Sequence, residues 1–172
     1  MAGLVTAAVL LVGAAGCGSD GVPPRTWAKH VCQALRPWSA SISDLTGRTQ
    51  REMRSVTTPA QAKASIVALL DAEARTSNRA RDKLLAAGVP DVDDGKKIAD
   101  QFSSALRSAS HSYGTARDAI RKLPTSDETA FYQGVTRAID GLNRHYNAGA
   151  LDTDKVRSAD LQQAFDDVPE CQ

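Results

Sequence analysis

Residues 98–123 read IADQFSSALRSASHSYGTARDAIRKL, and this stretch decides the fold. Apolar side chains recur in it at steps of three and four residues, which is the spacing that places them along one face of an α-helix. These positions are Ile98, Phe102, Ala105, Ala109, Tyr113, Ala116, Ile120 and Leu123. Pro124 follows directly, and proline disfavours the continuation of a helix because it lacks the backbone N–H and its ring clashes with the preceding turn. The stretch therefore predicts a long amphipathic helix that begins after Pro90 and ends before Pro124.

Two segments upstream carry the same helical pattern. The sequence at 58–61, Thr-Pro-Ala-Gln, is typical of a helix start, with a capping Thr, a Pro in the first turn and a Gln that completes a capping box. Gly88 and Pro90 end that segment. An earlier amphipathic segment, from about residue 25 to residue 53, contains Pro37, which predicts a kink or a split into two helices.

Downstream of Pro124 the pattern continues. Residues 125–128, Thr-Ser-Asp-Glu, form a second capping box and open a fourth amphipathic segment. A short helix follows at about residues 158–167. Four long helices with short connections favour antiparallel neighbours, so the sequence predicts an all-α, four-helix up-and-down bundle with a short C-terminal helix.

The N-terminus carries an apolar run, residues 2–16, that ends in small residues before Cys17. About 15 apolar residues are too few for a membrane-spanning helix, which needs about 20. The pattern resembles a bacterial lipoprotein signal, which implies cleavage before Cys17 and acyl chains on its sulfur. We therefore expect a signal peptide at 1–16, a lipidated tether at 17–25 and a helical domain at 26–172. A plain secreted protein and a buried N-terminal helix with a free Cys17 are the alternatives.

The other two cysteines lie near the two ends of the helical domain. Cys32 falls in the first turns of the first helix, and Cys171 lies just past the short terminal helix. An up-and-down bundle returns the chain to the pole where it began, so the two can meet. Disulfides form in exported proteins, and we expect one between Cys32 and Cys171. Two unpaired buried thiols are the alternative.

The charge of the chain is balanced overall but divided along its length. The 21 Lys and Arg against 20 Asp and Glu argue against a nucleic-acid partner, which usually meets a basic excess. Residues 17–89 carry 11 basic and 6 acidic side chains, whereas residues 90–172 carry 10 basic and 14 acidic ones. Either a basic helix pair packs beside an acidic one, or an acidic outer face at 152–170 meets a basic partner.

No residue pattern predicts catalysis. His30 and His145 flank their helix faces near the same pole, but without a third ligand they are expected to be surface residues, as is His111. The sequence at 91–95, Asp-Val-Asp-Asp-Gly, lacks the spacing of a calcium loop. The chain has no nucleophile elbow and no phosphate-binding loop. We therefore expect no catalytic residue, no metal and no cofactor.

Four sequence features together resemble the small secreted lipoproteins of actinobacteria. They are Cys17 after a run of small residues, Trp-Ala-Lys-His-Val-Cys at 27–32, Val-Asp-Asp-Gly-Lys-Lys at 92–97, and Pro-Glu-Cys at 169–171. The resemblance implies an exported, membrane-anchored helical protein of no established activity, and it transfers no catalytic residue.

These observations predict a lipid-anchored protein on the outer face of the cell membrane. Its expected role is that of a non-catalytic interaction or spacer module, with an envelope protein or glycan as the partner. A carrier of a small molecule or lipid is the alternative, and it requires a cavity between helices lined by residues such as Phe102, Tyr113 and Phe131. A hydrolase or metal enzyme would require His30 and His145 to converge with carboxylates.

Overall fold

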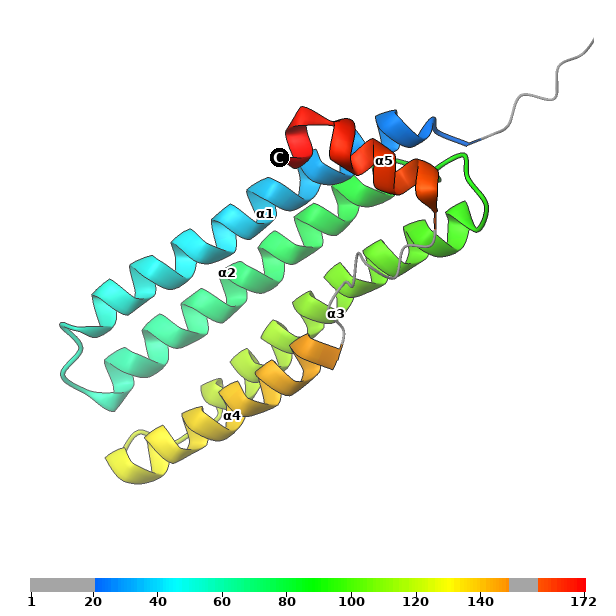
Figure 1. The fold of residues 1–172 in the computed structure, drawn as a ribbon. Coiled ribbons are helices and arrows are strands. Elements are labelled where there is room, and N and C mark those ends of the chain that lie inside the picture. Colours follow the sequence, from blue (N-terminus) through cyan, green and yellow to red (C-terminus); the bar gives the residue numbers. More distant parts are fainter. Residues whose placement is uncertain (1–20, 149–157) are drawn as a thin grey trace, which may run out of the picture.

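The protein is described by a computed structural model over residues 21–148 and 158–172, in which helices run almost throughout (Figure 1). The expected signal peptide and Cys17 lie outside these residues. The helices are α1 (Pro24–Met53), α2 (Pro59–Ala86), α3 (Gly95–Arg121), α4 (Glu128–Ala148) and α5 (Ala159–Asp167), followed by the 3₁₀ turn η2 (Pro169–Cys171). The predicted all-α bundle with a short C-terminal helix is confirmed.

Side chains at the helix starts explain where three of these helices begin. The Thr58 hydroxyl accepts the backbone N–H of Gln61, which caps α2, and the Ser158 hydroxyl accepts that of Leu161 at α5. At α4 the cap is Asp127, whose carboxylate accepts the N–H of Ala130 at 2.9 Å. Each of these bonds satisfies a backbone donor that has no partner inside its helix.

Helix α1 runs without interruption through Pro37, so the expected split into two helices is not found. A proline inside a helix removes one backbone hydrogen bond, here to the carbonyl of Gln33. Both Pro37 and Gln33 are exposed, so that carbonyl lies at the surface of the bundle. The long apolar face of α1 is therefore retained on both sides of the proline.

The last residues of the segment expected as a tether contact the helical body. The Val22 N–H donates to the Val89 carbonyl at 2.7 Å, and the Asp91 N–H donates to the Val22 carbonyl at 2.8 Å. Gly21 lies so close to Asp91 that an added Cβ would stand 2.8 Å from that residue. Helix α1 then begins at Pro24.

The helices lie side by side in chain order, and α5 lies across the first turns of α1 (Figure 1). Helix α1 packs against α2, α5 and η2, α2 against α3, and α3 against α4. Within the described residues α1 and α4 share no comparable contact, so the bundle is less tightly closed on that side. None of the described helices is long and apolar enough to cross a membrane.

The core has two main parts. One lies where α1, α2, α3 and α5 meet, around the fully buried Trp27 and Phe102, whose ring centroids are 5.3 Å apart. The second lies between α2 and α3, around Leu70 and Ile120, with half-buried side chains of α1 and α4 packed against it. This second part contains the polar layer described below.

Candidate functional site

A groove runs along the outer side of the α1–α2 pair. It consists of two adjoining hollows of about 380 and 160 Å³ that share Ala34 and Lys83 in their walls. Buried alanines form its floor, because small side chains let two helices approach closely; they are Ala34, Ala80 and Ala87. We call this feature the α1–α2 groove.

The rim of the α1–α2 groove is basic. Arg79 and Lys83 project from α2, and His30 lies opposite on α1. The Arg79 guanidinium donates to the Thr76 hydroxyl at 2.8 Å, and neither Arg79 nor Lys83 forms an ion pair with a described residue. No carboxylate is among the described residues that line the groove. The arrangement can attract an anionic group without competition from its own acids.

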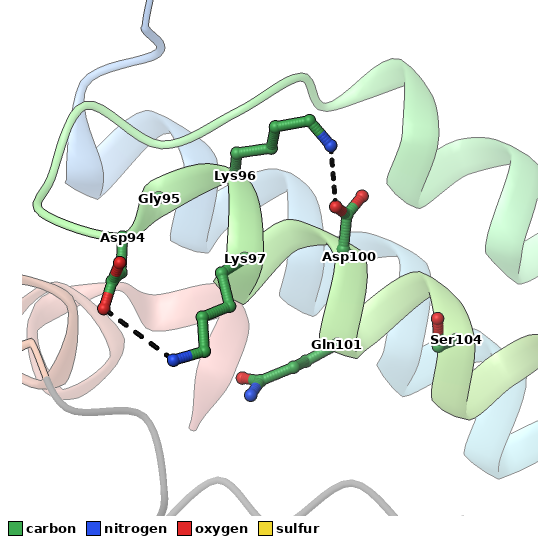
Figure 2. Close-up of a pocket in the computed structure, with 7 residues that line it drawn as sticks. All are labelled: Asp94, Gly95, Lys96, Lys97, Asp100, Gln101 and Ser104. Atoms are coloured by element: carbon green, nitrogen blue, oxygen red, sulfur yellow. Dashed lines mark hydrogen bonds and ion pairs between the residues drawn. The ribbon is translucent and has the colours of Figure 1, made fainter.

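A third hollow, of about 670 Å³, lies at the start of α3 (Figure 2). Lys96 and Lys97 border it, but each is occupied by a carboxylate of its own helix start. The Nζ of Lys96 lies 2.7 Å from Asp100, and that of Lys97 lies 3.9 Å from Asp94. Both lysines of this hollow are thus paired with carboxylates, so the hollow presents less unpaired positive charge to an incoming anion than the α1–α2 groove does.

The expected cysteine pair is found at disulfide distance. The sulfur atoms of Cys32 and Cys171 are 2.04 Å apart and join positions separated by 139 residues. Ion pairs support the same junction: Lys29 lies 3.0 Å from Glu170, and Arg25 lies 3.6 Å from Asp167. Hydrogen bonding to Lys29 holds the pKa of Glu170 below its usual range. Here basic side chains at the start of α1 pair with acidic side chains at the C-terminus, which are charges of opposite sign from the two halves of the chain.

The histidines do not converge. His30 lies beside Ala86 and Ala87 at the end of α2. His145 is exposed on α4 next to Tyr146, which packs on Tyr113 in the middle of α3. The expectation that the two histidines share a pole is therefore wrong, because α4 ends beside the middle of α3. No group of three His, Cys, Asp or Glu residues within the described ranges could hold a metal ion.

The aromatic residues expected around an interhelical cavity lie apart. Phe102 packs in the first part of the core, between Trp27 and Phe165. Tyr113 lies 11 residues further along α3, about 16 Å away at 1.5 Å per residue. Phe131 packs on Tyr132 near the start of α4. These three side chains therefore do not line one common cavity.

A buried carboxyl that the sequence analysis missed lies in the second part of the core. Glu73 on α2 is 4% exposed, and its Oε1 accepts the hydroxyl of Thr46 on α1 at 3.0 Å. Burial raises the pKa of Glu73 to about 7, and the Thr46 hydrogen bond opposes part of that rise. None of the ion pairs between described residues involves Glu73.

Two tyrosines lie close enough to this carboxyl to be affected by its charge. Tyr113 on α3 and Tyr146 on α4 have ring centroids 6.0 Å apart, and their pKa values are raised by burial and by the negative charge of Glu73. The Trp38 indole on α1 donates to the Ser77 hydroxyl at 3.0 Å, which in turn donates to the Glu73 backbone carbonyl. We call Trp38, Thr46, Glu73, Ser77, Tyr113 and Tyr146 the Glu73 layer.

A signal for the Glu73 layer is present in the sequence. The inward face of α2 passes from Leu70 to Ala80, and helical spacing places Glu73 and Ser77 on that face between them. Glu73, Ser77 and the neighbouring buried Thr76 interrupt the apolar stripe with polar side chains.

Comparison with known proteins gives no relative from which a function could be transferred. A scan against protein-family models, a search of curated proteins and a search of solved structures each returned no match. The proposals below therefore depend on the residues and geometry described above.

Proposed function

We propose that the protein is a lipid-anchored cell-envelope module that binds an acidic partner through the α1–α2 groove and performs no catalysis. The anchor is attributed to Cys17, at the end of the apolar N-terminal run, and it places the protein on the outer face of the cell membrane. The observation that carries the binding role is the basic, acid-free rim of the α1–α2 groove.

The dimensions and charge of the groove favour an acidic polypeptide segment as the occupant. The groove extends from His30 to Ser41 of α1, a helical rise of about 16 Å, which matches an extended or helical peptide. Its alanine floor offers an even apolar surface, and Arg79 and Lys83 stand one turn apart on one side. Exposed charge pairs each contribute about 0.2–1 kcal/mol, so such a contact is weak and depends on salt.

The test is a binding titration of the full chain with fluorescein-labelled poly-L-glutamate, followed by fluorescence anisotropy. We expect binding that weakens as salt rises, and a loss of roughly tenfold or more in the variant Arg79→Glu, Lys83→Glu. The matched control is Arg137→Glu, Arg144→Glu, which reverses two exposed cations on α4. Equal losses in both double variants would show a general charge effect and refute the groove as the docking face.

The anchor has a separate test. The intact mass of the protein purified from membranes should lack the first 16 residues and gain the mass of acyl chains. Cys17→Ser should release the chain from the membrane fraction. A mass that retains residues 1–16 would refute the proposed processing.

A carrier of a small molecule is the second candidate function, and the Glu73 layer favours it. A buried carboxyl without a cationic partner costs free energy in the folded protein. A ligand that supplies the opposite charge would recover part of that cost.

A further inference from the structure

We propose that the Glu73 layer is a binding site for a small organic cation, such as a protonated or quaternary amine. The inference gives the ligand class for the carrier function and is independent of the α1–α2 groove. It rests on the Glu73 carboxyl, on the aromatic rings beside it and on the side from which solvent reaches it.

The carboxyl supplies the recognition of charge. Within the described residues the Thr46 hydroxyl is the side-chain donor to Glu73, and it bonds to one carboxyl oxygen. No described cation pairs with Glu73, and none contributes to its pKa. A carboxylate buried in this state is short of both positive charge and hydrogen-bond donors, and a bound cation supplies the first.

The rings supply the recognition of an organic cation over a metal ion. The rings beside the carboxyl are those of Tyr113 on α3 and Tyr146 on α4, whose centroids are 6.0 Å apart. A cation within about 6 Å of the face of such a ring is attracted by its quadrupole, by about 0.5–2 kcal/mol. The chemistry of one carboxylate and two aromatic rings suits an ammonium group carrying apolar substituents. Metal ions instead prefer several oxygen, nitrogen or sulfur ligands, and no group of three His, Cys, Asp or Glu side chains among the described residues could hold one.

The layer is partly open to solvent at Thr46 on α1 and Tyr146 on α4, which are half-buried. Helices α1 and α4 make no extensive contact in the described part of the chain. Glu73 and Tyr113 are buried. We infer that a small cation would reach the carboxyl past these two half-buried side chains.

Charge linkage gives the site a specific pH-dependence. The titratable groups of the described neighbouring helices that interact with Glu73 are Tyr113 and Tyr146, phenols that are neutral around pH 7 and whose pKa values lie above their usual range. Glu73 must lose its proton before it binds a cation. A permanently charged ligand should therefore bind roughly tenfold more weakly at pH 6 than at pH 8, and binding near pH 7 should release protons.

The experiment is an isothermal titration of the full chain with tetramethylammonium chloride, a cation with no proton to lose, at pH 6, 7 and 8. Ionic strength is held constant with sodium chloride. Titrations at pH 7 in two buffers of different ionisation enthalpy measure the protons released. We expect saturable binding at pH 8, the tenfold weakening at pH 6 and proton release near pH 7.

Three variants make the result specific. Glu73→Gln keeps the size of the side chain but cannot ionise, so binding should be lost. Glu52→Gln, at an exposed position of α1, is the matched control and should bind as the wild type does. Tyr146→Leu keeps an apolar side chain without an aromatic face and should weaken binding several-fold, with folding checked by circular dichroism.

The outcomes separate this proposal from the docking role of the groove. Absence of binding at pH 8, equal binding by Glu73→Gln, or binding that does not change with pH would each overturn the cation site. Arg79→Glu, Lys83→Glu should leave tetramethylammonium binding unchanged. Conversely, Glu73→Gln should leave poly-L-glutamate binding unchanged, so either proposal can fail alone.

Discussion

Glu73→Gln should make the protein more stable at alkaline pH, and the size of the effect follows from the burial of the carboxyl. The native state raises the pKa of Glu73 from 4.5 to about 7. Between these values the native protein holds a proton that the unfolded chain has lost, so the free energy of unfolding falls as pH rises through this window. The stabilising contribution is fully present below pH 4.5 and is lost above about pH 7.

The expected magnitude is about 3 kcal/mol, because each pH unit between the two pKa values corresponds to about 1.4 kcal/mol. Glutamine has nearly the shape of the protonated acid and does not titrate. The free-energy difference between Glu73→Gln and wild type should therefore grow by about 3 kcal/mol between pH 4.5 and pH 8. At the acidic end of the range the two proteins should have nearly equal stability.

Urea unfolding at several pH values, followed by tryptophan fluorescence, measures this difference. Trp27 is fully buried and Trp38 is half-buried, so unfolding changes the environment of both. Subtracting the two curves removes the contribution of the other titrating groups, and Glu52→Gln serves as the exposed control. A difference that stays flat, or that favours the wild type as pH rises, would refute the inference that Glu73 is buried without a counter-charge.

Four further substitutions test other parts of the structure. Gly95→Ala should destabilise the fold by several kcal/mol, because the new Cβ would stand 2.1 Å from the Pro90 carbonyl oxygen. Gly114→Ala should instead stabilise the helix by up to about 1 kcal/mol, because its Cβ would have no atom within 4 Å. Thermal unfolding of the two variants checks both signs. Cys171→Ser should lower the free energy of unfolding by about 2–5 kcal/mol, because it opens a loop of 139 residues. Urea unfolding measures this difference, and the variant and the wild type should have equal stability once the wild-type disulfide is reduced. Trp38→Phe should lower the free energy of unfolding by about 1–2 kcal/mol, because the hydrogen bond from its indole to Ser77 is lost. In a double-mutant cycle, a larger loss of stability from the same substitution in a Ser77→Ala background would contradict that pairing.

Local signals in the sequence predict most of the fold. Proline, glycine and the capping residues limit each helix, and the bounds of α1, α2 and α5 follow them closely. Helix α3 begins later than expected, at Gly95, because Asp94 adopts a left-handed backbone with φ of 58° and the preceding residues turn back to meet Val22. That contact joins positions distant in the sequence, and no local pattern encodes it.

The candidate sites were harder to predict for the same reason. Helical spacing places Glu73 on the inward face of α2, but the depth of its burial depends on how α1, α3 and α4 pack there. The α1–α2 groove likewise depends on which faces of two helices remain uncovered. The pairing of Cys32 with Cys171 was accessible because it required only the topology of the bundle and the positions of two cysteines near its ends.

The bond between Cys32 and Cys171 also decides how the molecule bears a mechanical load. Cys171 stands one residue before Gln172, and residues 21–32 comprise only the segment that bonds to Val89 and Asp91 and the first turns of α1. A pull between Gly21 and Gln172 runs along these residues, crosses the sulfur bridge and leaves the chain. Residues 33–170 lie outside this covalent path, and they are loaded only through the Val22 hydrogen bonds to Val89 and Asp91 until those bonds break. Under such a pull the force passes through residues 21–32 and the disulfide bond, and the helices beyond them are not extended.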